Sequence, residues 1–137
     1  MKHRKLFVTL PVRDLQRSKA FFSALGFSFD PTFSDGESAC IVIGQDASVM
    51  LLPEGRFSSF TTRAPCDRST HLQALLAVSC ESRDEVDRMV KTAIENGGKT
   101  EDEPKDYGFM YDWSFYDLDG HGWGVAWMNP NAEPPAQ

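Results

Sequence analysis

The feature of this sequence that most restricts its fold is an order of predicted elements that occurs twice along the chain. Each half begins with an apolar strand, continues with an amphipathic helix and ends with three short strands. The repeat lies in the order of the elements and not in residue identity. The sequence therefore predicts an α+β fold of two tandem βαβββ modules, each with one helix covering one face of a small sheet.

The first module is expected to span about residues 5–53. Asp14 is the expected helix N-cap, and Gly26 is the expected C-terminal stop. Between them, Leu15, Phe21, Phe22 and Leu25 form an apolar stripe at helical spacing. The predicted strands of this module cover residues 5–11, 27–30, 38–43 and 48–52.

The second module is expected over about residues 71–128, after a linker at about 54–70 that has no periodicity. Ser82 and Glu85 have the spacing of a capping box, which predicts the start of a helix. Asn96-Gly97-Gly98 predicts its end. The predicted strands cover residues 72–79, 99–101, 109–116 and 123–128, and the proline-rich tail 129–137 is expected to be disordered.

Composition narrows the class of protein. The chain has 137 residues with 41% hydrophobic residues, which suits one soluble domain over residues 1–137. A net charge of −6 argues against a nucleic-acid partner. No apolar run reaches the ~18 residues of a membrane span, so we expect no membrane association and a cytoplasmic location. The cysteines Cys40, Cys66 and Cys80 form no CxxC pair and are expected to be reduced thiols, Cys40 and Cys80 packed in strands.

Three segments of the chain resemble the vicinal-oxygen-chelate superfamily, which includes glyoxalase I, bleomycin-resistance proteins and extradiol dioxygenases. They are the opening Phe7-Val8-Thr9-Leu10-Pro11-Val12-Arg13-Asp14-Leu15, the helix end Glu95-Asn96-Gly97-Gly98, and the closing Asp117-Leu118-Asp119-Gly120-His121-Gly122-Trp123. With Gly108-Phe109-Met110-Tyr111, the chain is most similar to the uncharacterised glyoxalase-like members. The resemblance implies a curved mixed sheet with a concave cavity, and a homodimer. It leaves open whether the modules pair within a chain or between chains.

The resemblance also implies where a metal would bind. Metal-using members take a His or Gln from the first strand of each module and a Glu or a similar residue from the last. In this sequence the four positions hold Phe7, Met50, Gln73 and Gly124. Phenylalanine and glycine offer no side-chain donor, and a thioether is a poor ligand for a hard divalent ion. We therefore expect no metal and no other cofactor.

The same alignment predicts a largely apolar ligand pocket, formed by Phe7, Thr9, Met50, Leu52, Gln73, Tyr111, Gly124 and Ala126. Such a surface with few polar groups is typical of a small-molecule site. The expected function is binding of a small, partly apolar molecule without a metal, as in the drug-sequestering members of the superfamily, and no residue is assigned a catalytic role. Two alternatives stay open: a metal-dependent lyase or dioxygenase of the glyoxalase I type, and a structural or interaction domain whose cavity is filled.

The histidines and paired aspartates have structural interpretations beside functional ones. His71 lies two residues before Gln73 and is either an acid–base candidate or a histidine at the strand edge. His121 is expected to hydrogen-bond within its turn. Asp117 and Asp119 have the spacing of a turn more than that of an acid–base pair. His3 is expected to be a solvated terminal residue.

Overall fold

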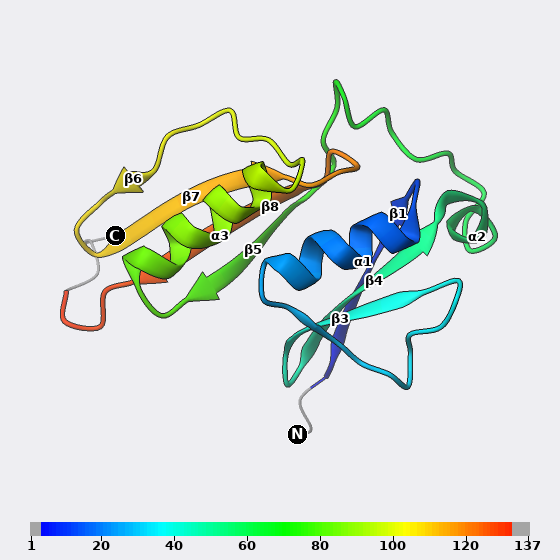
Figure 1. Cartoon of the computed structure of the whole chain (residues 1–137), viewed down its shortest axis with the longest axis horizontal. Coiled ribbons are helices and arrows are strands. Elements are labelled where there is room, and N and C mark those ends of the chain that lie inside the picture. The colour runs from blue at the N-terminus through cyan, green and yellow to red at the C-terminus, as the bar shows by residue number, and fades with distance from the viewer. Residues whose placement is uncertain (1–3, 133–137) are drawn as a thin grey trace. The chain divides into compact units, whose positions relative to one another are not determined.

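The chain divides into two compact units, Met1–Cys66 and Asp67–Gln137. The computed structural model describes residues 4–132. Each unit contains one four-stranded mixed sheet with a helix on one face (Figure 1). The predicted α+β class and the two tandem βαβββ modules are confirmed, as two separate sheets.

The first unit follows the predicted order of elements. Its sheet has the strand order β1-β4-β3-β2, with β1 parallel to β4 and the other neighbours antiparallel. Because β1 and β4 are parallel, the chain must cross over between them, and the crossover carries the helix α1. The elements are β1 (Leu6–Val12), α1 (Leu15–Ala24), β2 (Ser28–Phe29), β3 (Ala39–Gly44), β4 (Ala47–Pro53) and a short helix α2 (Glu54–Ser58).

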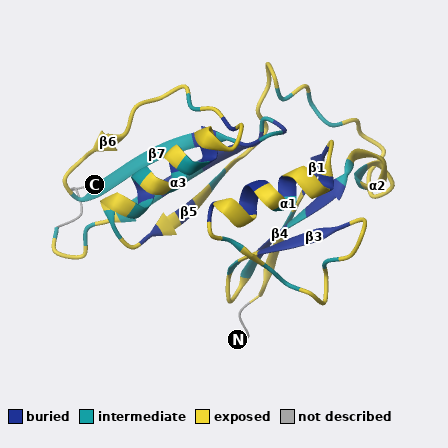
Figure 2. Ribbon diagram, viewed as in Figure 1, coloured by how far each residue is buried: buried dark blue, intermediate teal, exposed yellow. Residues whose placement is uncertain are grey.

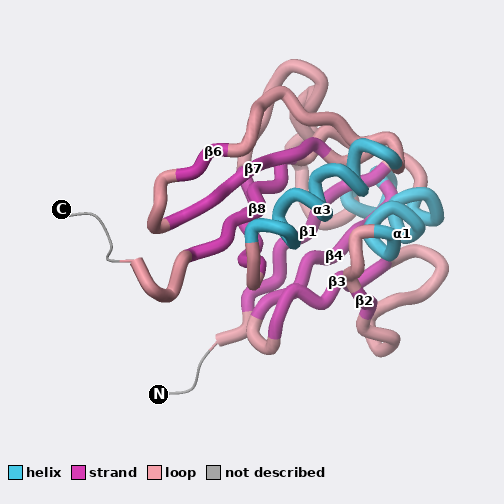
Figure 3. Tube along the Cα trace, turned by 60° about the vertical axis from the view of Figure 1, so that its left-hand side comes forward, coloured by secondary structure: helices cyan, strands magenta, loops and turns pink. Residues whose placement is uncertain are grey.

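The second unit repeats this topology. The strand order is β5-β8-β7-β6, with β5 parallel to β8, and the short strand β6 lies at the edge beside β7 (Figure 3). The helix α3 packs on β5, β7 and β8. The elements are β5 (Leu75–Cys80), α3 (Arg83–Glu95), β6 (Lys105–Asp106), β7 (Met110–Tyr116) and β8 (Gly122–Met128).

Both long helices begin at the predicted caps. The carboxylate of Asp14 accepts from the backbone N–H of Arg17 (3.1 Å), and the hydroxyl of Ser82 accepts from the N–H of Glu85 (3.0 Å). The carboxylate of Glu85 turns back to the N–H of Glu81 (2.9 Å), one residue before the cap. These contacts satisfy N–H groups that the first turn leaves without helical partners.

The core of each unit lies between its sheet and its helix (Figure 2). In the first unit the alternate strand residues Leu10, Val12, Ile41 and Leu51 are buried together with Phe21 and Phe22 of α1. In the second unit the buried residues are Val78, Phe115, Trp123 and Val125 from the strands, and Val86, Val90 and Ala93 from α3. The rings of Phe115 and Trp123 stack at 6.3 Å between centroids.

Three segments differ from the sequence-based expectation. The strand β5 begins at Leu75, later than predicted, because Asp67 holds the residues before the strand in a turn. The carboxylate of Asp67 accepts from the N–H of Ser69, and its carbonyl accepts from the N–H of His71. The predicted linker contains the helix α2. The predicted strand at 99–101 is a single bridge between Lys99 and Tyr116.

The predicted disordered tail lies partly within the structure. Asn129 donates from its backbone N–H to the carbonyl of Phe109 (2.8 Å), so the chain is still attached to the sheet at that point. Residues 133–137 lie outside the described part of the chain, as does His3. Cys40 and Cys80 are buried in strands as free thiols, as predicted, and Cys66 is partly buried. Within residues 4–132, no helix has the length and apolar character that a membrane span requires.

Candidate functional site

Each sheet has one face turned away from its helix, which we call its open face. Side chains alternate between the two faces of a strand, so the pairing register determines which residues share a face. In the first sheet, Phe7 pairs with Ser48, Thr9 with Met50, and Pro11 with Leu52. These residues alternate with the buried core row, so they belong to the open face of the first sheet. Four predicted pocket residues, Phe7, Thr9, Met50 and Leu52, thus lie on two adjacent strands.

The open face of the second sheet is lined mainly by small residues. Gly124 pairs with Ala77 on one side and with Ser114 on the other, and Ala126 pairs with Ser79 and Asp112. A Cβ added at Gly124 would come no closer than 3.6 Å to the Ala77 side chain, so close packing does not require glycine there. The predicted pocket residues Gly124 and Ala126 share this face.

Two predicted pocket residues lie elsewhere. Tyr111 pairs with Trp127 on the face that α3 covers, and its hydroxyl donates to the carboxylate of Asp87 on that helix (2.6 Å). This hydrogen bond is the main cause that raises the pKa of Tyr111 to about 12. Gln73 is exposed and precedes β5. His71 is exposed in the preceding turn, with its Nδ1 2.7 Å from the hydroxyl of Thr70.

The residues at the positions of the superfamily's metal ligands do not fit a metal. Phe7 and Gly124 have no donor atom, the thioether of Met50 suits soft ions only, and Gln73 lies outside its strand. Within residues 4–132, no group of three or more His, Cys, Asp or Glu side chains has an arrangement that could hold a metal ion. The side chains at these four positions therefore do not supply the ligand set of the metal-using members.

An aromatic pair stands on the open face of the first sheet. The rings of Phe7 and Phe33 meet edge to face with their centroids 6.2 Å apart. Phe33 comes from the loop of residues 30–38 that joins β2 to β3. The two side chains remain 46% and 47% exposed, so each presents ring surface to solvent.

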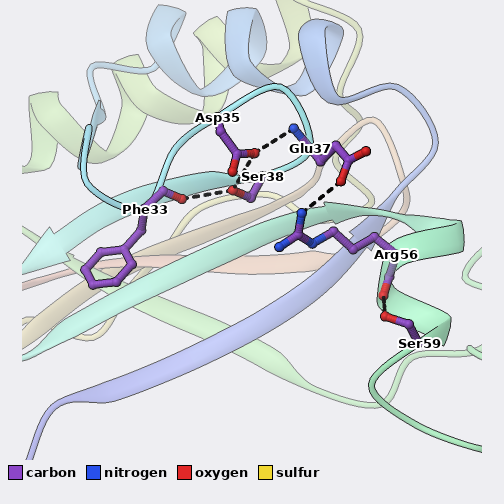
Figure 4. A network of polar contacts seen from close by, with 6 residues as sticks. All are labelled: Phe33, Asp35, Glu37, Ser38, Arg56 and Ser59. Atoms are coloured by element: carbon purple, nitrogen blue, oxygen red, sulfur yellow. Dashed lines mark hydrogen bonds and ion pairs between the residues drawn. The ribbon is translucent and has the colours of Figure 1, made fainter.

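The loop that carries Phe33 is held by a polar network (Figure 4). The hydroxyl of Ser38 lies 3.0 Å from the carbonyl of Phe33 and 3.1 Å from the carboxylate of Asp35. Asp35 also accepts from the N–H of Glu37 (2.7 Å), and these two contacts hold the pKa of its carboxyl below the ordinary value. Arg56 of α2 forms an ion pair with Glu37 (2.9 Å), which fastens the loop to the end of β4.

Two polar groups lie beside the aromatic pair. The ammonium of Lys5 stands 5.1 Å from the centroid of the Phe7 ring, within the range of a cation–π contact. Ser48, the register partner of Phe7, is 2% exposed, and its hydroxyl has no hydrogen-bond partner within the described part of the chain. Such an unsatisfied buried hydroxyl is uncommon in folded proteins.

The Asp117 turn between β7 and β8 is a structural element. The carboxylate of Asp117 accepts from the N–H groups of Asp119 (2.9 Å) and His121 (3.0 Å) and from the indole N–H of Trp123 (3.0 Å). Burial raises the pKa of Asp117, and the charge of His121 and these N–H donors oppose that rise. The geometry is that of a turn whose carboxylate organises the backbone, which agrees with the structural interpretation of Asp117 and His121.

Cys80 is a buried thiol at the end of β5. Burial, followed by the nearby carboxylate of Glu85, raises the pKa of its thiol to about 12. A thiol is reactive as the thiolate, and this environment suppresses the thiolate at neutral pH. Cys80 is therefore a packing residue.

Sequence reasoning missed three residues of the first open face: Lys5, Phe33 and Ser48. Ser48 was detectable, because it alternates in phase with Met50 along the predicted strand 48–52. Phe33 lies in a turn-rich loop without periodicity, so no pattern places it over a strand. Lys5 precedes β1, and its position over Phe7 depends on the conformation of its long side chain, which no sequence pattern predicts.

Comparison with known proteins supports the fold and the resemblance. Residues 4–44 match the family model of the bleomycin resistance protein-like N-terminal domain. No curated protein matches the chain. Several solved structures are similar to the chain. A hypothetical protein, SA1046 from S. aureus, is 26% identical, with a TM-score of 0.78 over 92% of this chain and 95% of that one.

Two further structures share the fold at lower identity. A glyoxalase-related enzyme from Fulvimarina pelagi is 20% identical, with a TM-score of 0.78 over 98% of this chain and 94% of that one. A glyoxalase/bleomycin resistance protein/dioxygenase family enzyme from Burkholderia phytofirmans PsJN is 15% identical, with a TM-score of 0.73 over 90% of this chain and 97% of that one. Together with the match at residues 4–44, these likenesses confirm the resemblance inferred from the sequence: the chain has the fold of the vicinal-oxygen-chelate superfamily.

Proposed function

We propose that this protein binds a small, partly apolar molecule on the open face of its first sheet, without a resident metal. The observation that carries the proposal is the row Phe7, Thr9 and Met50 on adjacent strands of the first sheet, which continues into the buried Leu52. Apolar and hydroxyl side chains stand there where the metal-using members of the superfamily present ligands. An apolar surface with a few polar groups is the usual chemistry of a small-molecule site.

A metal-dependent lyase or dioxygenase would require a different donor set. This alternative is tested by elemental analysis of protein prepared without a metal-affinity tag, before and after incubation with Ni, Zn, Mn and Fe(II). We expect metal contents at background in every sample. A stoichiometric, tightly held ion would overturn the metal-free proposal and would direct the search to ligands outside the four superfamily positions.

Binding itself is tested by thermal shift with a panel of small apolar and aromatic compounds. A ligand present at about 100 times its dissociation constant stabilises the folded state by ~2.7 kcal/mol, which raises the midpoint by several degrees. Thr9→Arg places a long charged side chain on the open face and is expected to abolish the shift. The matched control is Thr62→Arg, an exposed position of the 59–66 segment. An unchanged shift in Thr9→Arg would contradict binding on this face.

A further inference from the structure

The pair Phe7–Phe33 has the geometry of a preformed aromatic platform. Edge-to-face contact uses the edge of one ring and leaves ring surface of both side chains open, in agreement with their exposure of 46% and 47%. Exposed rings that lie together mark a surface that takes an apolar partner more often than isolated ones do. The partner that suits two phenyl rings of this size is a flat ring system.

Polar contacts within the protein hold the loop that carries Phe33. The carbonyl of Phe33 is bound by Ser38, and the loop is fastened through the ion pair of Glu37 with Arg56. In Figure 4 the ring of Phe33 points away from this polar network. These contacts hold the backbone of the loop at Phe33, and the ring itself contacts Phe7. Binding to a segment that is already held loses less conformational entropy than binding to a mobile one, which favours a recognition role for Phe33.

The charge beside the platform indicates the sign of the ligand. Lys5 places its ammonium over Phe7, so a charged group on a ring stacked there would meet a cation. The chain as a whole carries a net charge of −6, which repels anions at long range. The ammonium of Lys5 offsets that repulsion at the Phe7 ring, and it disfavours a cationic ligand there.

We propose that Phe7, Phe33 and Lys5 form a subsite for a flat aromatic molecule with an anionic substituent such as a carboxylate, sulfonate or phosphate. The proposal rests on the proposed function and specifies the ligand class for the open face of the first sheet. The rings of Phe7 and Phe33 contact the aromatic part, and the ammonium of Lys5 binds the anionic group.

Two fluorescent probes that differ in one group test the proposal. The probe 1-anilinonaphthalene-8-sulfonate carries a sulfonate, and N-phenyl-1-naphthylamine has the same ring system without it. We expect the intact protein to bind the sulfonate probe several-fold more tightly in a fluorescence titration. Lys5→Gln is expected to reduce this preference, because it removes the ammonium beside the Phe7 ring.

The aromatic part is tested with Phe33→Ala, which is expected to weaken both probes several-fold. Phe60→Ala removes a ring that is 70% exposed in the 59–66 segment and serves as the matched control, with no expected change. Phe33→Leu keeps the apolar volume, so it provides a folded variant if the alanine change unfolds the loop, and circular dichroism checks the fold of each protein.

The outcomes separate this subsite from the broader proposal. Equal affinities for the two probes, or a preference that Lys5→Gln does not alter, would overturn the anionic ligand class. Probe binding that is lost in Thr9→Arg but unchanged in both Phe33 variants would overturn the subsite and leave the proposed function standing. If neither the probes nor the compound panel bind the intact protein, both proposals fail.

Discussion

At the scale of single residues, two buried serines of the first unit have opposite hydrogen bonding. Ser38 has two acceptors within 3.1 Å, whereas the hydroxyl of Ser48 has no partner among the described residues. Ser38→Ala is expected to lower the free energy of unfolding by ~1 kcal/mol or more, since its acceptors stay behind. Ser48→Ala removes an unsatisfied buried group and is expected to be neutral or stabilising. Urea denaturation measures both, and a loss in Ser48→Ala as large as that in Ser38→Ala would contradict the assignment.

The hydrogen bond from Tyr111 to Asp87 predicts a pH dependence. It is the main cause that raises the phenol's pKa from 10 to about 12. Because the folded pKa lies above the unfolded one, the stability from this contact is fully present below pH 10 and is lost as pH rises through about 12. Asp87→Asn is expected to lower the tyrosine midpoint in an absorbance titration at alkaline pH. Asp84→Asn, on the same helix, leaves the hydrogen bond in place and should not lower it.

The open face was predictable from sequence only on strands where one residue could be assigned to a face, because alternation then assigns the others. Phe7 and Thr9 lie two apart on β1, as do Met50 and Leu52 on β4, so one correct assignment places the whole row. Tyr111 was assigned to the wrong face because the register of β7 against β8 depends on the turn between them. That register pairs Gly124 with Ser114, which puts the odd-numbered residues of β7 on the helix side.

At the scale of elements, the helix boundaries were the most predictable feature, since each depends on local chemistry. Asp14 and Ser82 cap the two long helices as their positions indicated. The start of β5 was not predictable in this way. The hydrophobic run begins at Leu72, but the Asp67 turn uses the backbone of the following residues and delays strand pairing until Leu75. A side-chain contact in the loop thus decides the boundary of the strand.

The end of α3 depends on close approach of the backbone at Gly98. A Cβ at this position would lie 2.8 Å from the carbonyl oxygen of Tyr116 and 2.9 Å from that of Ala93. Both neighbours are backbone atoms, so Gly98→Ala must push α3 away from the bridge between Lys99 and Tyr116. We expect a loss of ~1–3 kcal/mol in the free energy of unfolding, the usual cost of overpacking.

The control for that change is Gly36→Ala. Gly36 has open space around an added Cβ, and its φ is not positive. We expect its unfolding midpoint to stay close to that of the parent protein, because neither a clash nor backbone strain is introduced. If Gly98→Ala were as stable as Gly36→Ala in the same denaturation experiment, close packing would not be the reason for glycine at the end of α3.

At the scale of the whole molecule, the repeated order of elements predicted the architecture, and the fold comparison agrees with it. The repeat succeeds because each module has the same physical requirement, a small sheet that must bury one face under a helix. The same pattern says nothing about what covers the open faces, since no periodicity distinguishes a ligand from a second protein surface.

Two exposed leucines lie together at the start of the second sheet. Leu75 is 69% exposed and Leu72 is 41% exposed. Leu75 pairs with Gly122 on the open face, and a Cβ added at Gly122 would lie 2.8 Å from the Leu75 side chain and 3.1 Å from that of Leu72. Large apolar side chains left exposed next to each other are typical of a surface that associates. Together with the homodimer that the superfamily resemblance implies, this predicts a dimer in solution.

Sedimentation velocity across a range of protein concentrations tests this prediction. The parent protein is expected to sediment as a dimer, and Leu75→Glu is expected to shift it to a monomer because a buried, unpaired carboxylate opposes association. Phe60→Glu adds the same charge at an exposed ring of the 59–66 segment and should leave the dimer intact. A parent protein that stays monomeric at every concentration would contradict the dimer. A dimer that Leu75→Glu does not weaken would place the interface on another surface.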